Sequence, residues 1–205
     1  MTSNINKVEP TQFFSYLVET ANISENEAQH IDASLKRESY KKGDILLRKG
    51  ELCRHSFFVE KGLLRSYMLA GDGKEHVIQF APEKWFIVDR SSTYFNETSD
   101  SFIEAIEDTD VVLINDNFIC EISKTNPNFN KFNDKLLHNH IRQMQKRIKL
   151  LLGASAEVRY LSFIKTYHDL LQRVPQWMIA SYLGITPESL SRVRKDLAHK
   201  NFKPS

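Results

Sequence analysis

The sequence has little of several residue types that mark particular protein classes. Its 205 residues contain two cysteines, Cys53 and Cys120, too few for a disulfide scaffold or a four-thiolate metal site. Seven glycines and six prolines exclude collagen-like and low-complexity structure. No apolar run approaches the ~18 residues needed to span a bilayer, and residues 1–10 lack the pattern of a secretion signal. We therefore expect a globular cytoplasmic protein with reduced thiols and no membrane partner.

Catalytic and metal-binding patterns are also missing. The sequence has no P-loop, no G-x-S-x-G and no H-E-x-x-H. A metal enzyme built on strands would need clustered histidine and carboxylate ligands, and only His55 and His76 lie in the part of the chain that is expected to form strands and turns. The sequence therefore predicts no enzyme, no catalytic residues, no metal and no cofactor.

Charge divides the chain into two parts. Residues 1–130 carry 14 Lys and Arg against 21 Asp and Glu, a net charge of −7. Residues 131–205 carry 14 against 5, a net charge of +9. Such asymmetry is typical of an acidic module joined to a module that binds nucleic acid or a membrane surface.

Turns gather in the first half of the chain. Five of the seven glycines fall between Gly43 and Gly73, with short apolar runs between them. Short strands punctuated by such turns indicate an antiparallel sandwich or barrel, so residues 40–115 are expected to form a β-roll. The expected strands are Ile45–Leu47, Phe57–Val59, Leu63–Leu69, His76–Phe80, Ser101–Ile106 and Val111–Ile114.

A long helix is expected after the roll. Asn126 and Pro127 have the residue types of an N-cap followed by the first helical position, and no glycine or proline follows until Gly153. Apolar residues recur along it at heptad spacing, which favours a parallel homodimer seam over packing within one chain. The opposite face, with Arg142, Lys146, Arg147 and Lys149, is expected to face solvent. The seam residues are Leu137, Ile141, Met144, Ile148 and Leu151.

The C-terminal segment has the pattern of a helix-turn-helix. An amphipathic helix is expected over Ala156–Gln172, with Val158, Leu161, Ile164 and Leu171 on one side. In the next segment Ala180 is small enough for a helix crossing, and Gly184 allows a left-handed turn. Apolar residues that could hold the second helix follow at suitable spacing: Leu183, Ile185, Leu190, Val193 and Leu197.

The expected second helix carries polar side chains on its other face. Thr186 is expected to cap it, with Pro187 in its first turn. Hydroxyl, carboxylate and guanidinium groups can hydrogen-bond base edges and phosphates in a major groove. The candidate DNA-binding residues are Thr186, Glu188, Ser189, Ser191, Arg192, Arg194 and Lys195.

A Gly-turned β-roll, a long dimer helix and a C-terminal helix-turn-helix, in this order, resemble the Crp/Fnr family of bacterial transcription regulators, especially the short members of Bacteroidetes-type bacteria. The resemblance implies an α+β fold and an N-terminal antiparallel, jelly-roll-like sensor roll. It implies three parts: a sensor over residues 1–125, a dimerisation helix over 126–153 and a helix-turn-helix domain over 154–205. The family's wing would be reduced or absent, since only residues 198–205 follow the expected recognition helix.

The resemblance also implies how DNA is read. Glu188, Ser191 and Arg192 fill the family's E-x-x-S-R pattern, which implies a TTGA-like half-site in an inverted repeat. Pro187 stands where the catabolite-activator branch has a further base-reading Arg, so that branch's specificity is not carried over. The implied partners are double-stranded DNA, a second copy of the chain and RNA polymerase.

The sensor pocket departs from the cyclic-nucleotide pattern. The family's G-E-L turn falls at Val88-Asp89-Arg90, and its phosphate-binding Arg-Ser pair falls at Ser99-Asp100. A buried phosphate without its arginine is unfavourable, so cyclic AMP binding is not expected. Two alternatives are open: a degenerate member that acts through protein contacts, or a sensor of an unknown small molecule without specific DNA binding. Candidate residues of an effector pocket are Arg65, Tyr67, Gln79, Trp85, Asp89 and Arg90.

Overall fold

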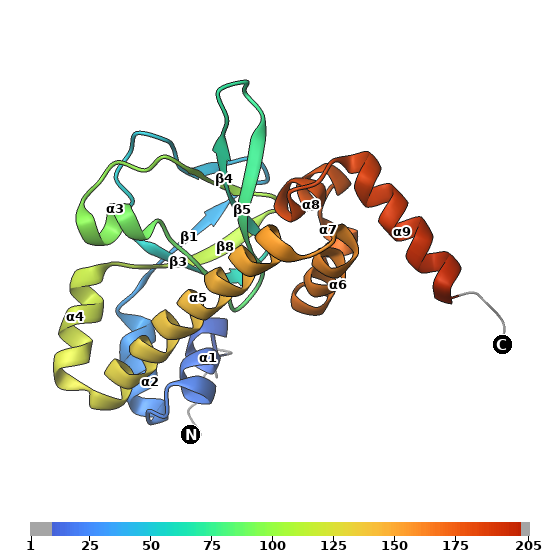
Figure 1. Cartoon of the computed structure of the whole chain (residues 1–205). Coiled ribbons are helices and arrows are strands. Elements are labelled where there is room, and N and C mark those ends of the chain that lie inside the picture. The colour runs from blue at the N-terminus through green and yellow to red at the C-terminus, as the bar shows by residue number, and fades with distance from the viewer. Residues whose placement is uncertain (1–9, 202–205) are drawn as a thin grey trace, which may run out of the picture.

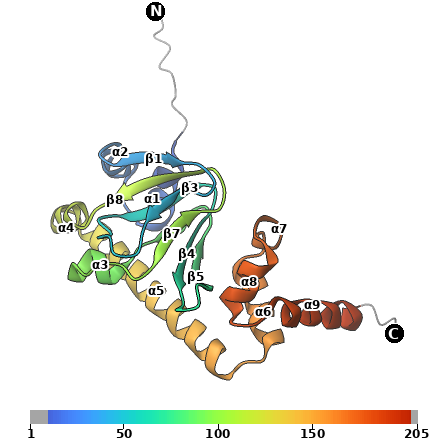
Figure 2. The same cartoon turned by 90° about the horizontal axis from the view of Figure 1, so that it is seen from above.

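The computed structural model describes residues 10–201 and contains two four-stranded antiparallel sheets that face each other as a roll (Figures 1 and 2). The first sheet has the strand order β1 (Lys36–Tyr40), β8 (Thr109–Ile114), β3 (Ser56–Lys61) and β6 (Phe86–Ile87). The second sheet has the order β2 (Ile45–Leu47), β7 (Phe102–Ala105), β4 (Leu64–Leu69) and β5 (Glu75–Ala81). The predicted β-roll is therefore confirmed.

Strand alternation decides which side chains fill the roll. Phe57 and Val59 of β3 point into the space between the sheets, while Phe58 between them points to the outer side. Because both faces of this strand are covered, its sequence contains consecutive apolar residues instead of alternating apolar and polar ones. The interior is packed with the buried residues Leu47, Cys53, Phe57, Val59, Leu64, Ala81, Ile87, Ile103, Ala105, Val111 and Leu113.

Helices cover the outer side of the first sheet. These are α1 (Gln12–Thr20), α2 (Glu25–Ala33), α4 (Asp116–Thr125) and the first part of α5 (Pro127–Gly153). The Ser24 hydroxyl accepts from the Glu27 amide, and the Glu27 carboxylate accepts in return from the Ser24 amide, which starts α2 as a capping box. A further short helix, α3 (Arg90–Phe95), lies between β6 and β7 and starts at the side-chain cap of Asp89.

The long helix α5 links the two ends of the molecule. Asn126 caps it through the Phe129 amide, and Pro127 stands in its first turn, as the sequence predicts. In Figure 1 it crosses the front of the roll from α4 to the C-terminal helices.

The C-terminal part consists of α6 (Ala156–Thr166), α7 (Leu170–Arg173), α8 (Gln176–Leu183) and α9 (Pro187–Asn201). It shares one apolar core with the second sheet of the roll. Phe80 of β5 packs against Phe163, Tyr167 and Tyr182, with ring centroids 5.5–6.2 Å apart. Ser181 of α8 accepts from the Val77 amide and donates to the Glu75 carbonyl, both at 2.9 Å. The two parts thus share buried apolar area as well as hydrogen bonds to the backbone.

The single helix predicted over Ala156–Gln172 was wrong. The helix ends at Thr166, and Tyr167 takes a non-helical backbone with φ −132° and ψ 65°. Tyr167 is buried between the rings of Phe80, Trp85, Phe163 and Tyr182, so tertiary packing overrides the local helical pattern.

The apolar side of that predicted helix is only partly buried. Val158 and Leu161 are exposed, while Tyr160 and Phe163 are the buried residues of α6. The aromatic residues can reach the core around Phe80, and this drives the helix to turn its larger side chains inward.

A charged cluster fixes the break at the end of α7. The Arg173 guanidinium donates to the carboxylates of Glu83, Glu107 and Asp169 and to the Gly62 carbonyl, at 2.7–3.1 Å. Partial burial raises the pKa of Glu83, but the hydrogen bonds from Arg173, the charge of Arg173 and backbone hydrogen bonds together lower the pKa overall. The same balance lowers the pKa of Asp169. Arg173 therefore ties α7 to three loops of the roll.

Replacing Arg173 by Met should destabilise the protein by ~1–3 kcal/mol, between the values for exposed and buried ion pairs. Carboxylates with a lowered folded-state pKa stabilise the protein above their unfolded pKa values and lose this effect as pH falls. The free energy of unfolding, measured with urea, should therefore differ most between wild type and variant at pH 7. This difference should shrink as the pH falls below the ordinary pKa values of 4.5 for Glu83 and 3.8 for Asp169. The exposed Arg54→Met should change stability by less than ~0.5 kcal/mol. A pH-independent difference would contradict the assigned pairing.

Candidate nucleic-acid interface

The turn between α8 and α9 has the geometry that the sequence predicts. Gly184 ends α8 in the left-handed conformation with φ +66°, and the Ile185 amide donates to the Ala180 carbonyl at 3.0 Å. Ala180 is fully buried where the two helices cross. A Cβ on Gly184 would lie 3.2 Å from Leu151, so a larger residue would press on α5. Gly184 therefore sets the direction in which α9 leaves the body.

The first turn of α9 is capped by a side chain. The Thr186 hydroxyl accepts from the Ser189 amide and donates to the Ser189 hydroxyl, both at 3.2 Å. A hydrogen bond from its own amide and one from Thr186 lower the pKa of Glu188. Glu188 is therefore an ionised acceptor in the first turn of the helix.

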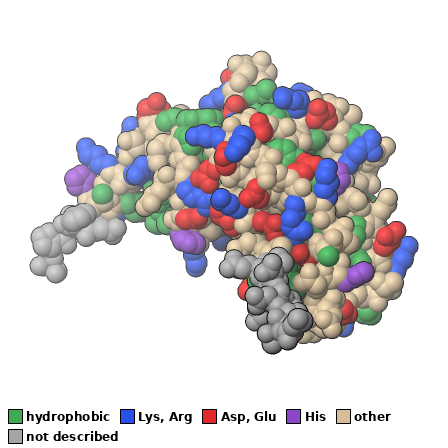
Figure 3. Space-filling view, turned by 180° about the vertical axis from the view of Figure 1, so that it is seen from behind, with side chains coloured by type: hydrophobic (Ala, Val, Ile, Leu, Met, Phe, Trp, Pro, Cys, Tyr) green, Lys and Arg blue, Asp and Glu red, His purple; other side chains and the backbone are tan. Residues whose placement is uncertain are grey.

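One side of α9 is buried and the other faces solvent. Leu190 is buried, and Ile185, Val193 and Leu197 pack against the shared core. The helix stands away from the body, in red in Figures 1 and 2. In the view from behind, basic side chains lie on this arm (Figure 3). Of the predicted DNA-binding residues, Ser189 is half-buried, and six are exposed: Thr186, Glu188, Ser191, Arg192, Arg194 and Lys195.

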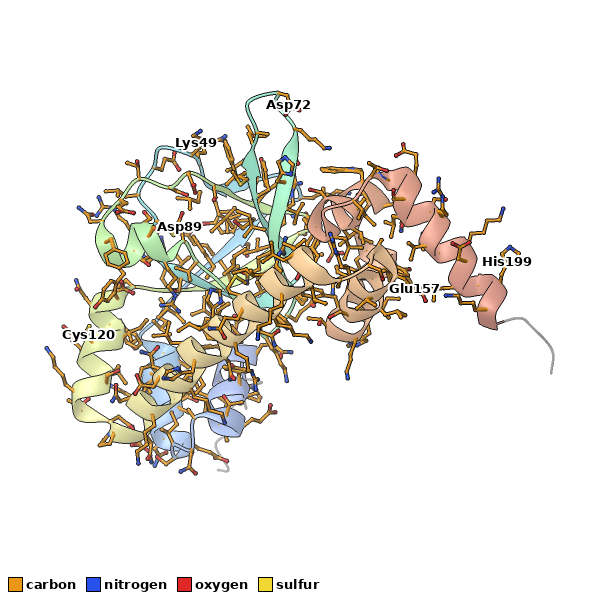
Figure 4. All side chains as sticks on the ribbon, viewed as in Figure 1. Lys49, Asp72, Asp89, Cys120, Glu157 and His199 are labelled. Atoms are coloured by element: carbon orange, nitrogen blue, oxygen red, sulfur yellow. The ribbon has the colours of Figure 1, made fainter. Side chains whose placement is uncertain are left out.

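The far end of α9 is braced against α6. Lys200 donates to both carboxylate oxygens of Glu157 at 2.9 Å. Figure 4 shows Glu157 at α6 and His199 toward the outer end of α9. Lys200 is thus engaged within the protein, while Arg192 and Lys195 project from the middle of the helix.

The candidate effector residues do not form one group. Arg65 is 3% exposed and lies on the second sheet, where it pairs with Glu75 and Glu104. Its guanidinium also stacks between Tyr67 and Trp177, 4.1 and 5.3 Å from the ring centroids. Since Trp177 belongs to α8, Arg65 and Tyr67 contribute to the contact between roll and C-terminal part.

Asp89 lies elsewhere, at the start of α3 (Figure 4). Its carboxylate accepts from the Ser92 amide at 3.1 Å and from the Ser99 hydroxyl at 2.6 Å. The Ser99 side chain is buried and also accepts from the Ser101 amide. The two positions that align with the cyclic-nucleotide motifs therefore meet and bond to each other.

The other three candidates, Gln79, Trp85 and Arg90, line one cavity beside α5. Gln79 donates to the Phe86 carbonyl at 2.9 Å, and the Trp85 ring packs against Tyr167. Arg65, Tyr67 and Asp89 do not line this cavity. The structure thus separates the six predicted residues into three places.

The predicted seam of α5 forms an outward-facing apolar row. Leu137, Ile141, Ile148 and Leu151 are exposed, with Ile148 54% exposed, and Met144 is half-buried. The neighbouring Leu152 is 83% exposed. A row of this kind in water is typical of a contact surface.

The expectation that Arg147 faces solvent was wrong. Its guanidinium donates to the carbonyls of Val77, Ile78 and Tyr182, and it stacks on the Tyr182 ring at 3.8 Å. Sequence reasoning missed this inward contact because helical spacing gives the face of a side chain but not what approaches it.

Comparison with known proteins gives consistent matches. The model of the cyclic nucleotide-binding domain matches residues 37–126. Electron transport regulator A of Shewanella oneidensis is 25% identical over 183 residues, covering 83% of this chain and 72% of that protein. The fumarate and nitrate reduction regulatory protein of Yersinia pestis is 26% identical over 183 residues, with the same coverage of both. At this coverage the two matches extend beyond the domain over residues 37–126.

The solved structure of FixK2 from Bradyrhizobium japonicum matches with a TM-score of 0.71 and 20% identity, covering 83% of this chain and 89% of that chain. This likeness shows a shared fold. The chain therefore contains a cyclic nucleotide-binding domain and is similar, over most of its length, to transcription regulators of the Crp/Fnr type. Its parts follow one another in the order roll, long helix and helix-turn-helix.

Metal sites and membrane spans are not found in the described part of the chain. There, no group of three or more His, Cys, Asp or Glu side chains is arranged to hold a metal ion. Over residues 10–201, no helix combines the length and hydrophobicity needed to cross a membrane.

Proposed function

We propose that this protein is a homodimeric, cytoplasmic transcription regulator of the Crp/Fnr type that binds an inverted-repeat DNA operator through α9. The observation that carries the proposal is the exposed polar face of α9, which stands clear of the body. The proposed division is a sensor over residues 1–125, a dimerisation helix over 126–153 and a DNA-binding domain over 154–205. RNA polymerase is the proposed partner at the promoter.

Glu188 and Arg192 are the proposed base readers. They are four positions apart on α9, hence neighbours on one face of the helix, and both are exposed. Arg192 can donate two hydrogen bonds to O6 and N7 of a guanine, and ionised Glu188 can accept from a cytosine or adenine amino group. This pair fits a TTGA-like half-site.

Arg194 and Lys195 are the residues proposed to bind phosphates, with hydroxyl support from Thr186, Ser189 and Ser191. Binding to phosphates positions the helix but carries no sequence information. Replacing a base-reading residue should therefore change the sequence preference, whereas replacing a phosphate-binding residue should change the affinity for all sequences.

Arg192→Ala should flatten the preference at the guanine position, a loss of ~1–3 kcal/mol of discrimination. Lys195→Ala should weaken binding to all sequences alike and reduce the salt slope by about one unit for each phosphate that is no longer neutralised. The measurement is binding selection on a randomised duplex library, followed by affinities at several salt concentrations. If Arg192→Ala keeps the sequence preference at uniformly lower affinity, Arg192 is not a base reader.

The second candidate function is a degenerate member that acts through protein contacts alone. Lys200 favours it slightly, because its pairing with Glu157 removes one basic group from DNA binding. A mobility shift with random duplex DNA separates the two functions. If the protein does not bind DNA even at low salt, the result favours action through protein contacts alone.

Dimer formation is proposed to use the exposed apolar row of α5. Burying a Leu or Ile there contributes ~1.5–3 kcal/mol each. Ile141→Glu with Ile148→Glu should therefore give monomers and weaken DNA binding, measured by light scattering and mobility shift. Gln145→Glu with Lys149→Glu, on exposed positions outside the row, is the matched control and should remain dimeric. A dimer in the first variant would place the interface elsewhere.

The sensor is proposed not to bind cyclic AMP. The Ser99 hydroxyl donates to the Asp89 carboxylate at 2.6 Å, so the positions that align with the phosphate and ribose contacts bond to each other. A phosphate there would lack its arginine and would be repelled by the neighbouring carboxylate.

Cyclic AMP at millimolar concentration should accordingly leave the melting temperature and the DNA affinity unchanged. A ligand that binds only the native state must raise the melting temperature by mass action. A concentration-dependent rise in thermal scans would overturn this part of the proposal, and cyclic GMP serves as a second probe.

A further inference from the structure

A cavity of about 380 Å³ runs along α5, and Met144 and Leu151 of the apolar row also line it. It extends from Phe13 and Tyr16 of α1, past β5 and β6, to Phe163 of α6 and Tyr182 of α8. This volume is in the range of small-molecule sites. The cavity thus touches the sensor roll, the long helix and the C-terminal part at once.

This cavity is separate from the interior of the roll. The space between the two sheets is filled by its own cluster of buried apolar side chains, such as Val59, Ile103 and Val111, and none of these three lines the cavity. It is also separate from the Ser99–Asp89 position, since neither residue lines it. A molecule bound here would occupy a different place from the motif-aligned site.

The charges around the cavity are of one sign. Among the described residues that line it there is no Asp and no Glu. The basic residues that line it are Lys84, Arg90, His140, Arg142, Lys146, Arg147 and Arg159. A concave surface with one sign of charge and low-dielectric walls attracts ions of the opposite sign.

Some of these cations already have partners. Arg147 donates to three backbone carbonyls, and Arg159 donates to the carbonyls of Ala154 and Leu183. Lys84 lies 3.7 Å from Glu19. Because these three groups are engaged in shaping the wall, an anion would be met by the other basic side chains of the cavity.

Arg90 and His140 come from different elements, α3 and α5, and both line the cavity. Burial lowers the pKa of His140, and the charge of Arg90 lowers it further. Burial also lowers the pKa of Arg90, while Asp116 opposes this. Arg90 is exposed and His140 is half-buried, and both line the cavity, so an anion bound beside them would be favourable.

Most of the other side chains that line the cavity are apolar, and many of these are aromatic. The rings of Phe13, Tyr16, Phe86, Phe129 and Phe132 line the cavity near α1 and the first turns of α5. An apolar body that binds there is removed from water, which is favourable in proportion to the apolar area that is buried. An inorganic ion would leave these walls unused.

We propose that this cavity is a binding site for an amphipathic anion: a small molecule with an apolar body held by the aromatic wall and a carboxylate or phosphate held by Arg90 and His140. The proposal does not depend on DNA binding, and its test contains no DNA.

The experiment uses the full chain and the anionic fluorescent dye 8-anilinonaphthalene-1-sulfonate. Its fluorescence should rise to saturation, and dodecanoate or dodecyl phosphate should displace it. The uncharged dodecanol should displace it at least tenfold less well, and acetate should not displace it at all. Whichever of dodecanoate and dodecyl phosphate displaces the dye at the lower concentration shows whether the site prefers a carboxylate or a phosphate headgroup.

Arg90→Gln with His140→Gln should weaken dodecanoate binding at least tenfold. Arg54→Gln, at an exposed arginine outside the cavity, is the control and should bind within twofold of wild type. Circular dichroism and thermal unfolding check that the double variant is folded.

Three results would overturn the proposal. The first is displacement by dodecanol as strong as by dodecanoate. The second is unchanged binding in the double variant. The third is saturable binding by the monomeric Ile141→Glu, Ile148→Glu variant but not by the wild-type dimer. This result would mean that the long helix of the second copy fills the cavity in the dimer.

Discussion

The contact of Arg147 with three backbone carbonyls is the constraint on which the arrangement of the parts depends. One planar guanidinium reaches β5 through Val77 and Ile78 and α8 through Tyr182, and it stacks on the Tyr182 ring. An arginine fork presents its donors in fixed directions, so it holds three elements in one geometry. Because this side of α5 is turned inward, the row with Ile141 and Ile148 is turned outward. The same contact sets the side of α5 that lines the cavity.

Much of the fold follows from patterns that are local in sequence. The glycine turns and the apolar runs between them predict β2 to β5, β7 and β8, because strand alternation and turn chemistry need no knowledge of distant residues. The predicted helix-turn-helix was confirmed for the same reason: Ala180, Gly184 and Leu190 act within one short segment. Asn126 and Pro127 similarly define the start of α5.

Other elements depend on tertiary contacts that spacing does not reveal. The strand β1 is polar, with the sequence KRESY, and it forms because β8 supplies a paired edge. The break at Tyr167 exists because four aromatic rings surround that side chain and Arg173 anchors the following turn. Of the candidate effector residues, Arg65 was the most misleading. A strand arginine is a plausible ligand contact, but its register places it opposite Glu104, and this carboxylate neutralises it.

The shared core makes the direction of α9 a property of the whole molecule. To turn α8 against β5, the chain must withdraw Phe80 from the rings of Phe163 and Tyr182, and it must break the hydrogen bonds of Ser181. It must also find new acceptors for Arg147 and Arg173, since a buried cation without partners costs several kcal/mol. Packed interfaces of this kind do not deform continuously, so any second arrangement of α9 must be a discrete state with its own set of contacts. The cavity lies against α5, β5 and α8, the three elements that meet at Arg147, so a molecule bound in it contacts each element that such a transition would move.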